Sequence, residues 1–141
     1  FRLAAEAGAS IGLPEVELGV VPAWGGTARL TRCVGRDRAL DLMLRARKID
    51  GREALKIGLV HSVHPLAQLK AAAHALALEL AAMPPLAVAG ILRCVVGAGA
   101  ASLPDALAEE RRAVLRCAGS PDQQEGFAAF LAKRKPVFSG G

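Results

Sequence analysis

The stretch Gly12–Leu30, with the sequence GLPEVELGVVPAWGGTARL, decides how the rest of this chain is interpreted. A carboxylate, Glu15, follows Pro14 near its start, and the pair Gly25-Gly26 precedes residues typical of the first turns of a helix. Glycines before a helix let the backbone approach a ligand closely and leave free N–H groups at the helix start. Taken singly, these features indicate only a tight turn that feeds a helix, because a Pro-Glu or Gly-Gly pair is weak evidence.

The spacing across the whole stretch is more specific than any of its parts. The fixed positions are Gly12, Pro14, Glu15, Leu18, Gly19, Pro22, Gly25, Gly26, Thr27, Arg29 and Leu30. This spacing resembles the crotonase superfamily of enoyl-CoA hydratases and isomerases, whose usual text is close to GQPEIxLGxxPGAGGTQRL. The family also often shows a run ending in A-x-x-x-G-L-V, which Ala54 and Gly58-Leu59-Val60 match. The resemblance then continues along the chain to Phe138.

The resemblance implies an α/β fold, the C-terminal part of a crotonase-like (ClpP/crotonase) spiral fold that is mostly helical with a few short strands. It implies that residues 1–63 form the end of the spiral β-core with the active-site glutamate turn. Residues 64–141 would form the C-terminal helical trimerisation region. The opening text FRLAA resembles the strand after a central catalytic segment. We therefore expect the chain to begin in mid-domain, with most of the spiral strands N-terminal to Phe1.

Local patterns predict the individual elements. The extended pieces are expected at Phe1–Ala5, Ile11-Gly12 and Leu59–Val63, with one helical turn at Glu15–Leu18. The expected helices are Gly26–Cys33, one capped by Asp37, one from Asp50 to Gly58, one from Pro65 to the Pro84-Pro85 stop, Leu86–Val96, and two capped by Ser102 and Ser120.

Apolar spacing also predicts which side chains are buried. In the helix after Asp37, Leu40, Met43 and Leu44 are expected to share a buried face. Leu86–Val96 is apolar nearly all round, so we expect it to be largely buried. The charged block Glu109–Arg112 is expected to form a solvated face.

Composition limits the classes of partner. The chain has 141 residues and a net charge of +5, with scattered charges and one short basic cluster, Lys133-Arg134-Lys135. Only 4% of the residues are aromatic, so few rings are present to stack on bases, and we favour an anionic small ligand over nucleic acid. A merely solvated basic surface is the simplest alternative.

The cysteine and histidine counts bear on compartment and metal. An odd number of widely spaced cysteines, Cys33, Cys94 and Cys117, favours free buried thiols in a reducing compartment. His61 and His64 have no further ligand at a completing spacing, so no metal site is expected. No apolar run is long enough for a membrane span, and the first residues do not resemble a signal peptide. The resemblance implies the cytoplasm if the protein is bacterial, or alternatively the mitochondrial matrix.

Hydration of an enoyl thioester needs a deprotonated water beside the β-carbon, a proton for the α-carbon, and fixed donors for the enolate oxygen. The family usually supplies two glutamates and two backbone N–H groups. Glu15 matches the second glutamate, so the resemblance implies that it acts as a general acid/base. We expect the turn to exclude water, with Val20, Val21 and Trp24 bounding one face. The alternative from the residues alone is an exposed turn carboxylate, which is our interpretation of Glu17.

The resemblance also implies substrate-binding positions. They are Pro14, Val20, Ala23, Trp24, Gly25, Phe130 and Lys133. Where the family often has Pro-Gly-Ala-Gly-Gly, Ala23 keeps a backbone N–H and Trp24 adds bulk near the acyl pocket, which puts the acyl chain length in doubt. Phe130 and Lys133 match positions that cover coenzyme A from a neighbouring subunit, where a lysine can meet a phosphate. Their alternative is a solvated basic helix end.

The leading hypothesis is hydration of a 2-enoyl-CoA to a 3-hydroxyacyl-CoA. The alternatives are an enoyl-CoA isomerase and a non-catalytic crotonase-like scaffold for oligomerisation. The first glutamate and both oxyanion donors are expected upstream of Phe1. Expected partners are an acyl-CoA substrate and sister subunits in a homotrimer or dimer of trimers, without nucleic acid, membrane or any cofactor beyond the coenzyme A of the substrate. A nucleic-acid binder would instead show strongly salt-dependent binding to oligonucleotides.

Overall fold

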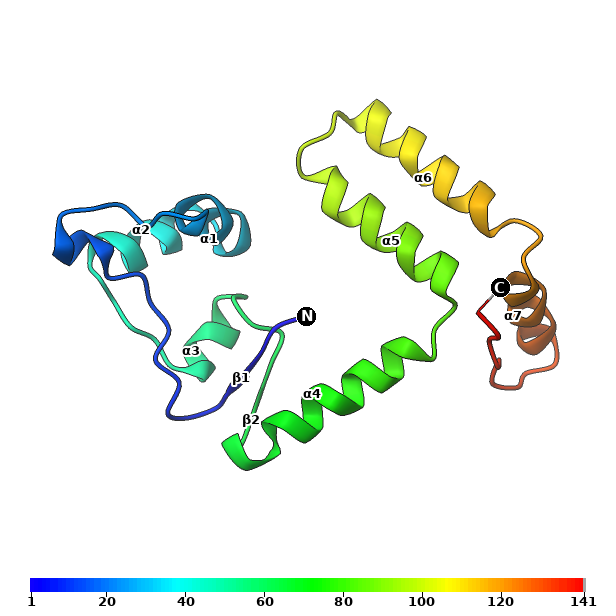
Figure 1. The fold of residues 1–141 in the computed structure, drawn as a ribbon, viewed down its shortest axis with the longest axis horizontal. Coiled ribbons are helices and arrows are strands. Elements are labelled where there is room, and N and C mark those ends of the chain that lie inside the picture. Colours follow the sequence, from blue (N-terminus) through cyan, green and yellow to red (C-terminus); the bar gives the residue numbers. More distant parts are fainter. Residues whose placement is uncertain (141) are drawn as a thin grey trace. The chain divides into compact units, whose positions relative to one another are not determined.

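A computed structural model describes residues 1–140, which divide into two compact units, Phe1–Ala75 and a second that begins at Leu76 (Figure 1). The first unit contains β1 (Leu3–Ala5), the 3₁₀ helix η1 (Glu15–Leu18), α1 (Gly26–Val34), α2 (Arg36–Leu44), α3 (Gly51–Lys56) and β2 (Ser62–His64). Helix α4 (Leu66–Ala81) spans the division, and the second unit continues with α5 (Pro85–Ala98), α6 (Leu103–Cys117) and α7 (Pro121–Leu131). The predicted mostly helical architecture with a few short strands is confirmed.

The two strands form a short parallel pair that joins the start of the first unit to a segment near its end. Leu3 pairs with Ser62 and Ala5 with His64. The predicted second strand, Leu59–Val63, begins too early. Both Leu59 N and Val60 N donate to Ala54 O, at 2.8 and 3.2 Å, so these residues close α3 before the strand can start. The expected extended piece at Ile11 is an isolated antiparallel bridge to Ile49.

Helix α2 buries a different face from the predicted one. Gly35 is its N-cap and Arg36 its first residue, so Asp37 lies in the first turn without capping it. The buried residues are Ala39, Leu42 and Met43. The prediction of Leu40 and Leu44 was wrong, since both are exposed. A shift of one position turns the face by about 100°, and only Met43 belongs to both sets.

The core of the first unit has two small clusters. One contains the buried side chains Ala4, Leu42, Ile49, Ala54 and Val60. The other contains Val34, Ala39 and Met43. Leu30 of α1 packs against both clusters, so the helix that follows the glycine pair is anchored in the core.

Helix α3 lies unusually close to β1. Asp50 caps it by accepting from Glu53 N at 2.8 Å, as the capping-box spacing predicts. Gly51, the first helical residue, is buried. A Cβ at this position would stand 1.9 Å from the backbone oxygen of Ala5. Helix and strand therefore touch through a glycine that no larger residue can replace without moving backbone.

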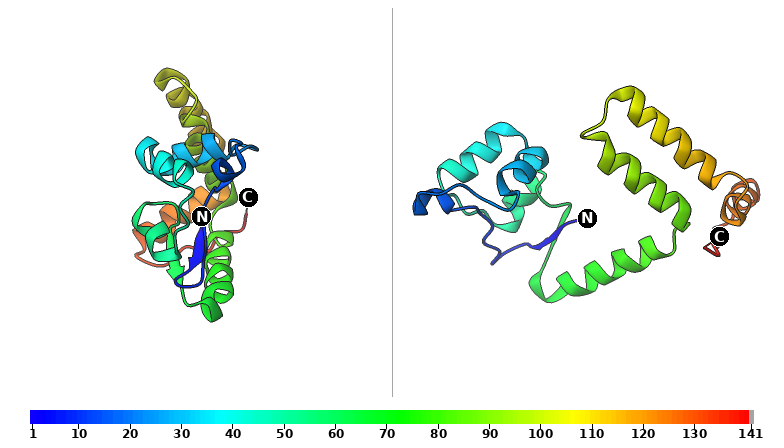
Figure 2. Two further views of the ribbon diagram at one scale, coloured as in Figure 1. Left: turned by 90° about the vertical axis from the view of Figure 1, so that its left-hand side faces the viewer. Right: turned by 45° about the horizontal axis from the view of Figure 1, so that its top comes forward.

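In the second unit, α5 and α6 form an antiparallel hairpin, and the right-hand view in Figure 2 shows them side by side. Gly90 of α5 faces Ala113 of α6, where a Cβ on the glycine would lie 3.2 Å from that of the alanine. Ser102 and Ser120 cap α6 and α7 by accepting from Asp105 N and Gln123 N, as predicted.

The charged block on α6 is only partly a solvated face. Glu109 is half-buried and contacts Arg112 and Arg116, at 2.9 and 2.8 Å, and Arg93 of α5 at 3.7 Å. Hydrogen bonds from Arg116 and then Arg112 hold the pKa of Glu109 below its usual range. The predicted solvated role is therefore wrong for Glu109, which links the two helices.

Helix α5 is less buried than its sequence predicts. Gly90 is its one buried residue. Its large side chains Ile91, Leu92, Val95 and Val96 are all more than half exposed. Within residues 1–140, no single helix is long and apolar enough to cross a bilayer. Only α4 and α5 taken together reach that length, and the chain bends between them.

Candidate active site

The turn that carries Glu15 is built by local hydrogen bonds. Pro14 precedes η1, and its carbonyl accepts from Glu17 N at 2.9 Å. Gly19 ends the 3₁₀ helix with a φ of 71°, a left-handed conformation that suits glycine. Val20 N then returns to Glu15 O at 3.2 Å. The predicted helical turn at Glu15–Leu18 is confirmed, and it fixes the backbone on which the carboxylate stands.

The Glu15 carboxylate contains an unpartnered buried oxygen. Its Oε2 is shielded from solvent, and among residues 1–140 no group donates a hydrogen bond to it. Buried polar atoms in folded proteins are nearly always hydrogen-bonded, because an unsatisfied one costs free energy. The Glu17 side chain, two residues later, is exposed. Glu15 is therefore distinguished from its neighbour by an acceptor that needs a water, a substrate or a donor from outside this chain.

The glycine pair has a steric reason at each position. Gly25 has a φ of 84°, and a Cβ there would lie 2.7 Å from Arg29 Cζ. The Arg29 guanidinium folds back to donate to the carbonyl of Trp24. A Cβ on Gly26 would lie 3.0 Å from that of Pro22. Gly25 and Gly26 therefore leave the space that Arg29 and Pro22 occupy in the tight turn before α1.

Trp24 has a backbone conformation that is rare for a bulky residue. Its φ is 60°, in the left-handed region. Its side chain is 94% exposed, and Val20 and Val21 are also more than half exposed. The three side chains expected to bound one face of the turn are therefore largely uncovered within residues 1–140. Their apolar surfaces face outward from the turn.

The predicted site residues fall into two groups. Pro14, Glu15, Val20, Ala23, Trp24 and Gly25 belong to the turn between β1 and α1, in the first unit. Phe130 and Lys133 lie at the end of α7, in the second unit. Phe130 is exposed, and Lys133 has a φ of 53°. Each group contains one non-glycine residue with a positive φ, Trp24 in the first and Lys133 in the second.

Two carboxylates of α7 were not predicted to have any role. Asp122, only 4% exposed, accepts from Ser139 N at 2.7 Å and from Gly140 N. Glu125 accepts from both Nη atoms of Arg134, at 2.6 and 2.7 Å, and from Val137 N at 2.8 Å. We call Asp122 and Glu125, with the backbone they bind, the tail clasp. The sequence signal for it is the pair of acids three residues apart on the helix that precedes the basic cluster.

The contacts of Glu125 in the tail clasp lower the pKa of its carboxyl group. The hydrogen bonds from Arg134, and then the one from Val137 N, lower the pKa of Glu125 from 4.5 to about 2. A carboxyl whose pKa is lower in the folded state stabilises that state above its unfolded pKa, and the contribution disappears as the pH falls through the folded value.

We therefore expect an acid-sensitive tail. Between about pH 4.5 and pH 2, wild-type protein should progressively lose the stabilising contribution of Glu125. A Glu125→Gln variant should be less stable at neutral pH and show a smaller change over that interval. Thermal unfolding at a series of pH values measures both. Parallel pH curves for the two proteins would contradict the assignment.

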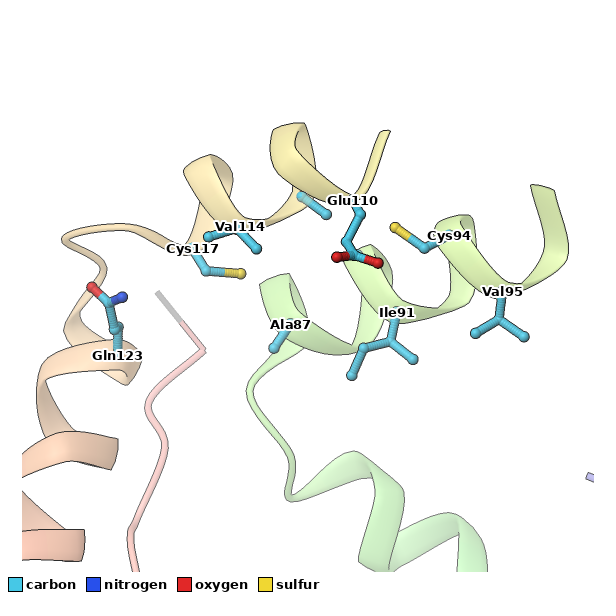
Figure 3. Close-up of a pocket in the computed structure, with 10 residues that line it drawn as sticks. Ala87, Ile91, Cys94, Val95, Glu110, Val114, Cys117 and Gln123 are labelled. Atoms are coloured by element: carbon cyan, nitrogen blue, oxygen red, sulfur yellow. The ribbon is translucent and has the colours of Figure 1, made fainter. Parts of the chain in front are cut away.

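The second unit also contains an open groove of about 410 Å³ between α5 and α6 (Figure 3). Its lining is mostly apolar, including Ile91, Val95 and Val114. Figure 3 shows Glu110 and Cys117 extending from α6 toward α5. The cysteines are free in the part of the chain that the structure describes. With one charged side chain in its lining, this groove suits contact with apolar surface better than acid/base chemistry.

The family model described as enoyl-CoA hydratase/isomerase matches residues 1–141. The Mycobacterium bovis protein named "Probable enoyl-CoA hydratase echA8" is 40% identical over 131 residues, which is 93% of this chain and 51% of that protein. The 2,3-dehydroadipyl-CoA hydratase of Escherichia coli is 37% identical over 94% of this chain and 52% of its own length. This chain therefore spans about half the length of these relatives.

A solved structure gives the same result. The chain superposes on the enoyl-CoA hydratase of Bacillus anthracis with a TM-score of 0.93 and 36% identity. The match covers 100% of this chain and 54% of that structure. The likeness therefore extends over both units and is not confined to the motif at Gly12–Leu30.

Proposed function

Since this chain belongs to the enoyl-CoA hydratase/isomerase family, we propose that it carries an acid/base glutamate, Glu15, of an enzyme that hydrates 2-enoyl-CoA thioesters. The product would be the 3-hydroxyacyl-CoA. The observation that carries the proposal is the buried and unpartnered Oε2 of Glu15. Hydratases among the relatives support the reaction class.

Hydration adds the oxygen of water to the β-carbon and a proton to the α-carbon. A carboxyl group that is shielded from bulk water, yet free of protein donors, can exchange a proton with either the attacking water or the α-carbon. An oxygen already committed to an arginine or a backbone N–H would first have to give up that bond. Glu15 fits the task because no group among residues 1–140 donates a hydrogen bond to its Oε2.

The turn beside Glu15 would set the acyl pocket. Trp24 places a large ring outside the backbone of the turn, and the Arg29 bond to its carbonyl fixes the backbone from which that ring projects. Ala23 lies in the same segment between β1 and α1 as Glu15, and it keeps a backbone N–H. In this proposal, Pro14, Val20, Ala23, Trp24 and Gly25 contact the acyl-thioester end of the substrate.

Isomerisation of a 3-enoyl-CoA is the second candidate. It moves one proton between carbons and can be carried out by a single carboxyl group. One observation favours it: among residues 1–140, Glu15 is the one side chain with a buried, unpartnered polar oxygen. The test is to offer crotonyl-CoA and a 3-enoyl-CoA in parallel to the protein that carries this chain. Turnover of neither substrate would favour the non-catalytic scaffold.

Exposed apolar side chains support a homotrimer or dimer of trimers as the proposed assembly. They include Ile91, Val95, Phe127, Phe130 and Leu131. Large apolar side chains left exposed in such number often mark a protein–protein contact. Phe130 and Lys133 would then cover the coenzyme A of a neighbouring subunit.

Lys133→Ala tests the proposed contact with coenzyme A. A lysine that meets a phosphate far from the reacting carbons contributes to substrate and transition state equally, so its loss should raise KM and leave kcat nearly unchanged. Hydrogen bonds to charged groups contribute about 1.5 kcal/mol or more, which corresponds to roughly a tenfold rise. The assay is steady-state hydration of crotonyl-CoA.

Lys135→Ala is the matched control, because it removes the same charge from an exposed lysine two residues away. Its KM should stay near wild type. Raising the salt concentration should weaken wild-type binding toward that of Lys133→Ala. Equal KM values for the two variants would indicate that Lys133 is only part of a solvated helix end.

A further inference from the structure

Lys133 has a strained backbone at a position where glycine is the usual residue. Helix α7 ends at Leu131, and the chain then turns through Lys133 with a φ of 53°. Lys133 N donates to Phe130 O at 3.2 Å, and Arg134 N donates to Ala129 O at 3.0 Å. Such helix ends favour glycine because a Cβ is disfavoured in the left-handed region. A lysine here needs an explanation outside the turn itself.

The same strain occurs at only two other non-glycine residues within 1–140, Trp24 and Ala46. Residues in sparsely populated backbone regions persist when the surrounding structure fixes them, and they often gather at functional sites. At Trp24 the fixing contact is the Arg29 guanidinium on its carbonyl. At Lys133 the helix-end hydrogen bonds are followed directly by the contacts of the tail clasp.

The tail clasp holds the chain on the C-terminal side of Lys133. Arg134, the next residue, is bound by both of its Nη atoms to Glu125. Glu125 also accepts from Val137 N, and Asp122 accepts from Ser139 N and Gly140 N. On the N-terminal side, Lys133 is continuous with α7. Both acids stand on that same helix, so residues on either side of Lys133 are tied to one rigid element.

An apolar contact also joins the segment after Lys133 to α7. A Cβ on Gly126 of α7 would lie 3.8 Å from the ring of Phe138, so the ring lies against the helix at the residue after Glu125. Asp122, Gly126 and Glu125 thus share the surface along which residues 134–140 run. The returning segment is held by charge, by backbone hydrogen bonds and by an aromatic ring.

We propose that Asp122 and Glu125 are positioning residues that hold Lys133 in its left-handed conformation. The role of Lys133 toward coenzyme A rests on the proposed function, whereas the hold on its backbone does not. Neither acid needs to touch the ligand. Each would act on binding only through the direction in which the Lys133 backbone presents its side chain.

The backbone arm of the test is hydrogen exchange on the protein that carries this chain. Glu125→Gln and Asp122→Asn should each raise the exchange rates of the amides at 133–140 by about tenfold or more, as expected when a local structure opens. Amides within α5 and α6 should keep their wild-type rates. Glu79→Gln, which alters an exposed carboxylate on α4, is the control. Unchanged exchange at 133–140 in both clasp variants would overturn the proposal.

Lys133→Gly separates strain from charge. Glycine tolerates the left-handed conformation, so this variant should melt about 2–5 °C above Lys133→Ala, while both lack the ammonium group. Equal melting temperatures would mean that the backbone at this position is not held in a strained state, against the proposal.

The ligand arm is isothermal titration with coenzyme A in a double-mutant cycle. If the clasp acts through Lys133, Glu125→Gln should weaken binding several-fold in wild type and have no further effect in Lys133→Ala. Additive losses would overturn the positioning role. If Lys133→Ala binds like wild type while the exchange arm succeeds, the clasp stands and the proposed role of Lys133 toward coenzyme A fails.

Discussion

We expect Glu15→Gln to lower the turnover of crotonyl-CoA by about 10²–10⁴-fold in the protein that carries this chain, the range typical of losing one general acid/base. Glutamine has nearly the same shape as glutamate, so η1 and its closing bonds to Gly19 and Val20 should persist. It cannot exchange a proton at the carboxyl position. Binding of coenzyme A should therefore stay near the wild-type value while kcat falls.

Glu17→Gln is the matched control for this experiment. It makes the same chemical change in the same 3₁₀ helix, at a side chain that is exposed. Its kcat should stay within a factor of about two to three of wild type, since surface changes rarely exceed 0.5 kcal/mol. Near-normal turnover of both crotonyl-CoA and a 3-enoyl-CoA by Glu15→Gln would remove Glu15 from the mechanism.

Much of the fold could be predicted because its helix boundaries depend on local chemistry. Asp50, Ser102 and Ser120 cap their helices as their spacing indicates. The buried face of α2 could not be predicted in this way, because Leu40, Met43 and Leu44 have the same helical spacing as the buried set Ala39, Leu42 and Met43. The packing of Ala39 and Met43 with Val34 of α1 distinguishes the buried face from the predicted one.

The burial of α5 shows a different limit. Its sequence is apolar nearly all round, yet Ile91, Val95 and Val96 are exposed in this chain. Hydrophobicity indicates that a side chain is to be covered, but it does not identify the covering surface. The sequence pattern therefore predicts contacts that residues 1–140 do not themselves supply.

The sequence nominates the residues of the candidate site but does not give their geometry. The motif spacing singled out Glu15, and the chain belongs to the family that this spacing resembles, while the role of Glu15 stays a prediction. The missing donor at Oε2 is a property of the folded turn and is invisible in the sequence. The tail clasp was missed because it joins Asp122 to Gly140 across a helix and a turn. No local propensity encodes a carboxylate that binds backbone seventeen or eighteen residues away.

Gly51→Ala should strongly destabilise the first unit, the part of the chain that holds Glu15. The new Cβ would stand 1.9 Å from Ala5 O and 2.9 Å from Ala5 C. Those are backbone atoms of a strand that is paired with β2, and Glu6 N next to them donates to His64 O at 2.8 Å. To make room, α3 must separate from β1 or the strand pair must break.

Overpacking a tight site costs about 1–3 kcal/mol and occasionally more. We expect Gly51→Ala to reach at least the upper part of that range, about 3 kcal/mol, because backbone rather than a flexible side chain must move. Folded proteins have only about 5–15 kcal/mol of net stability, so the loss should appear as a melting temperature lower by roughly 10 °C.

Gly97→Ala in α5 is the matched control, since nothing lies within 4 Å of its Cβ position and its backbone is not left-handed. That control should be neutral or slightly stabilising, by up to about 1 kcal/mol, as alanine favours helix over glycine. Differential scanning calorimetry compares the two variants, and a wild-type melting curve for Gly51→Ala would show that α3 and β1 do not make this contact in solution.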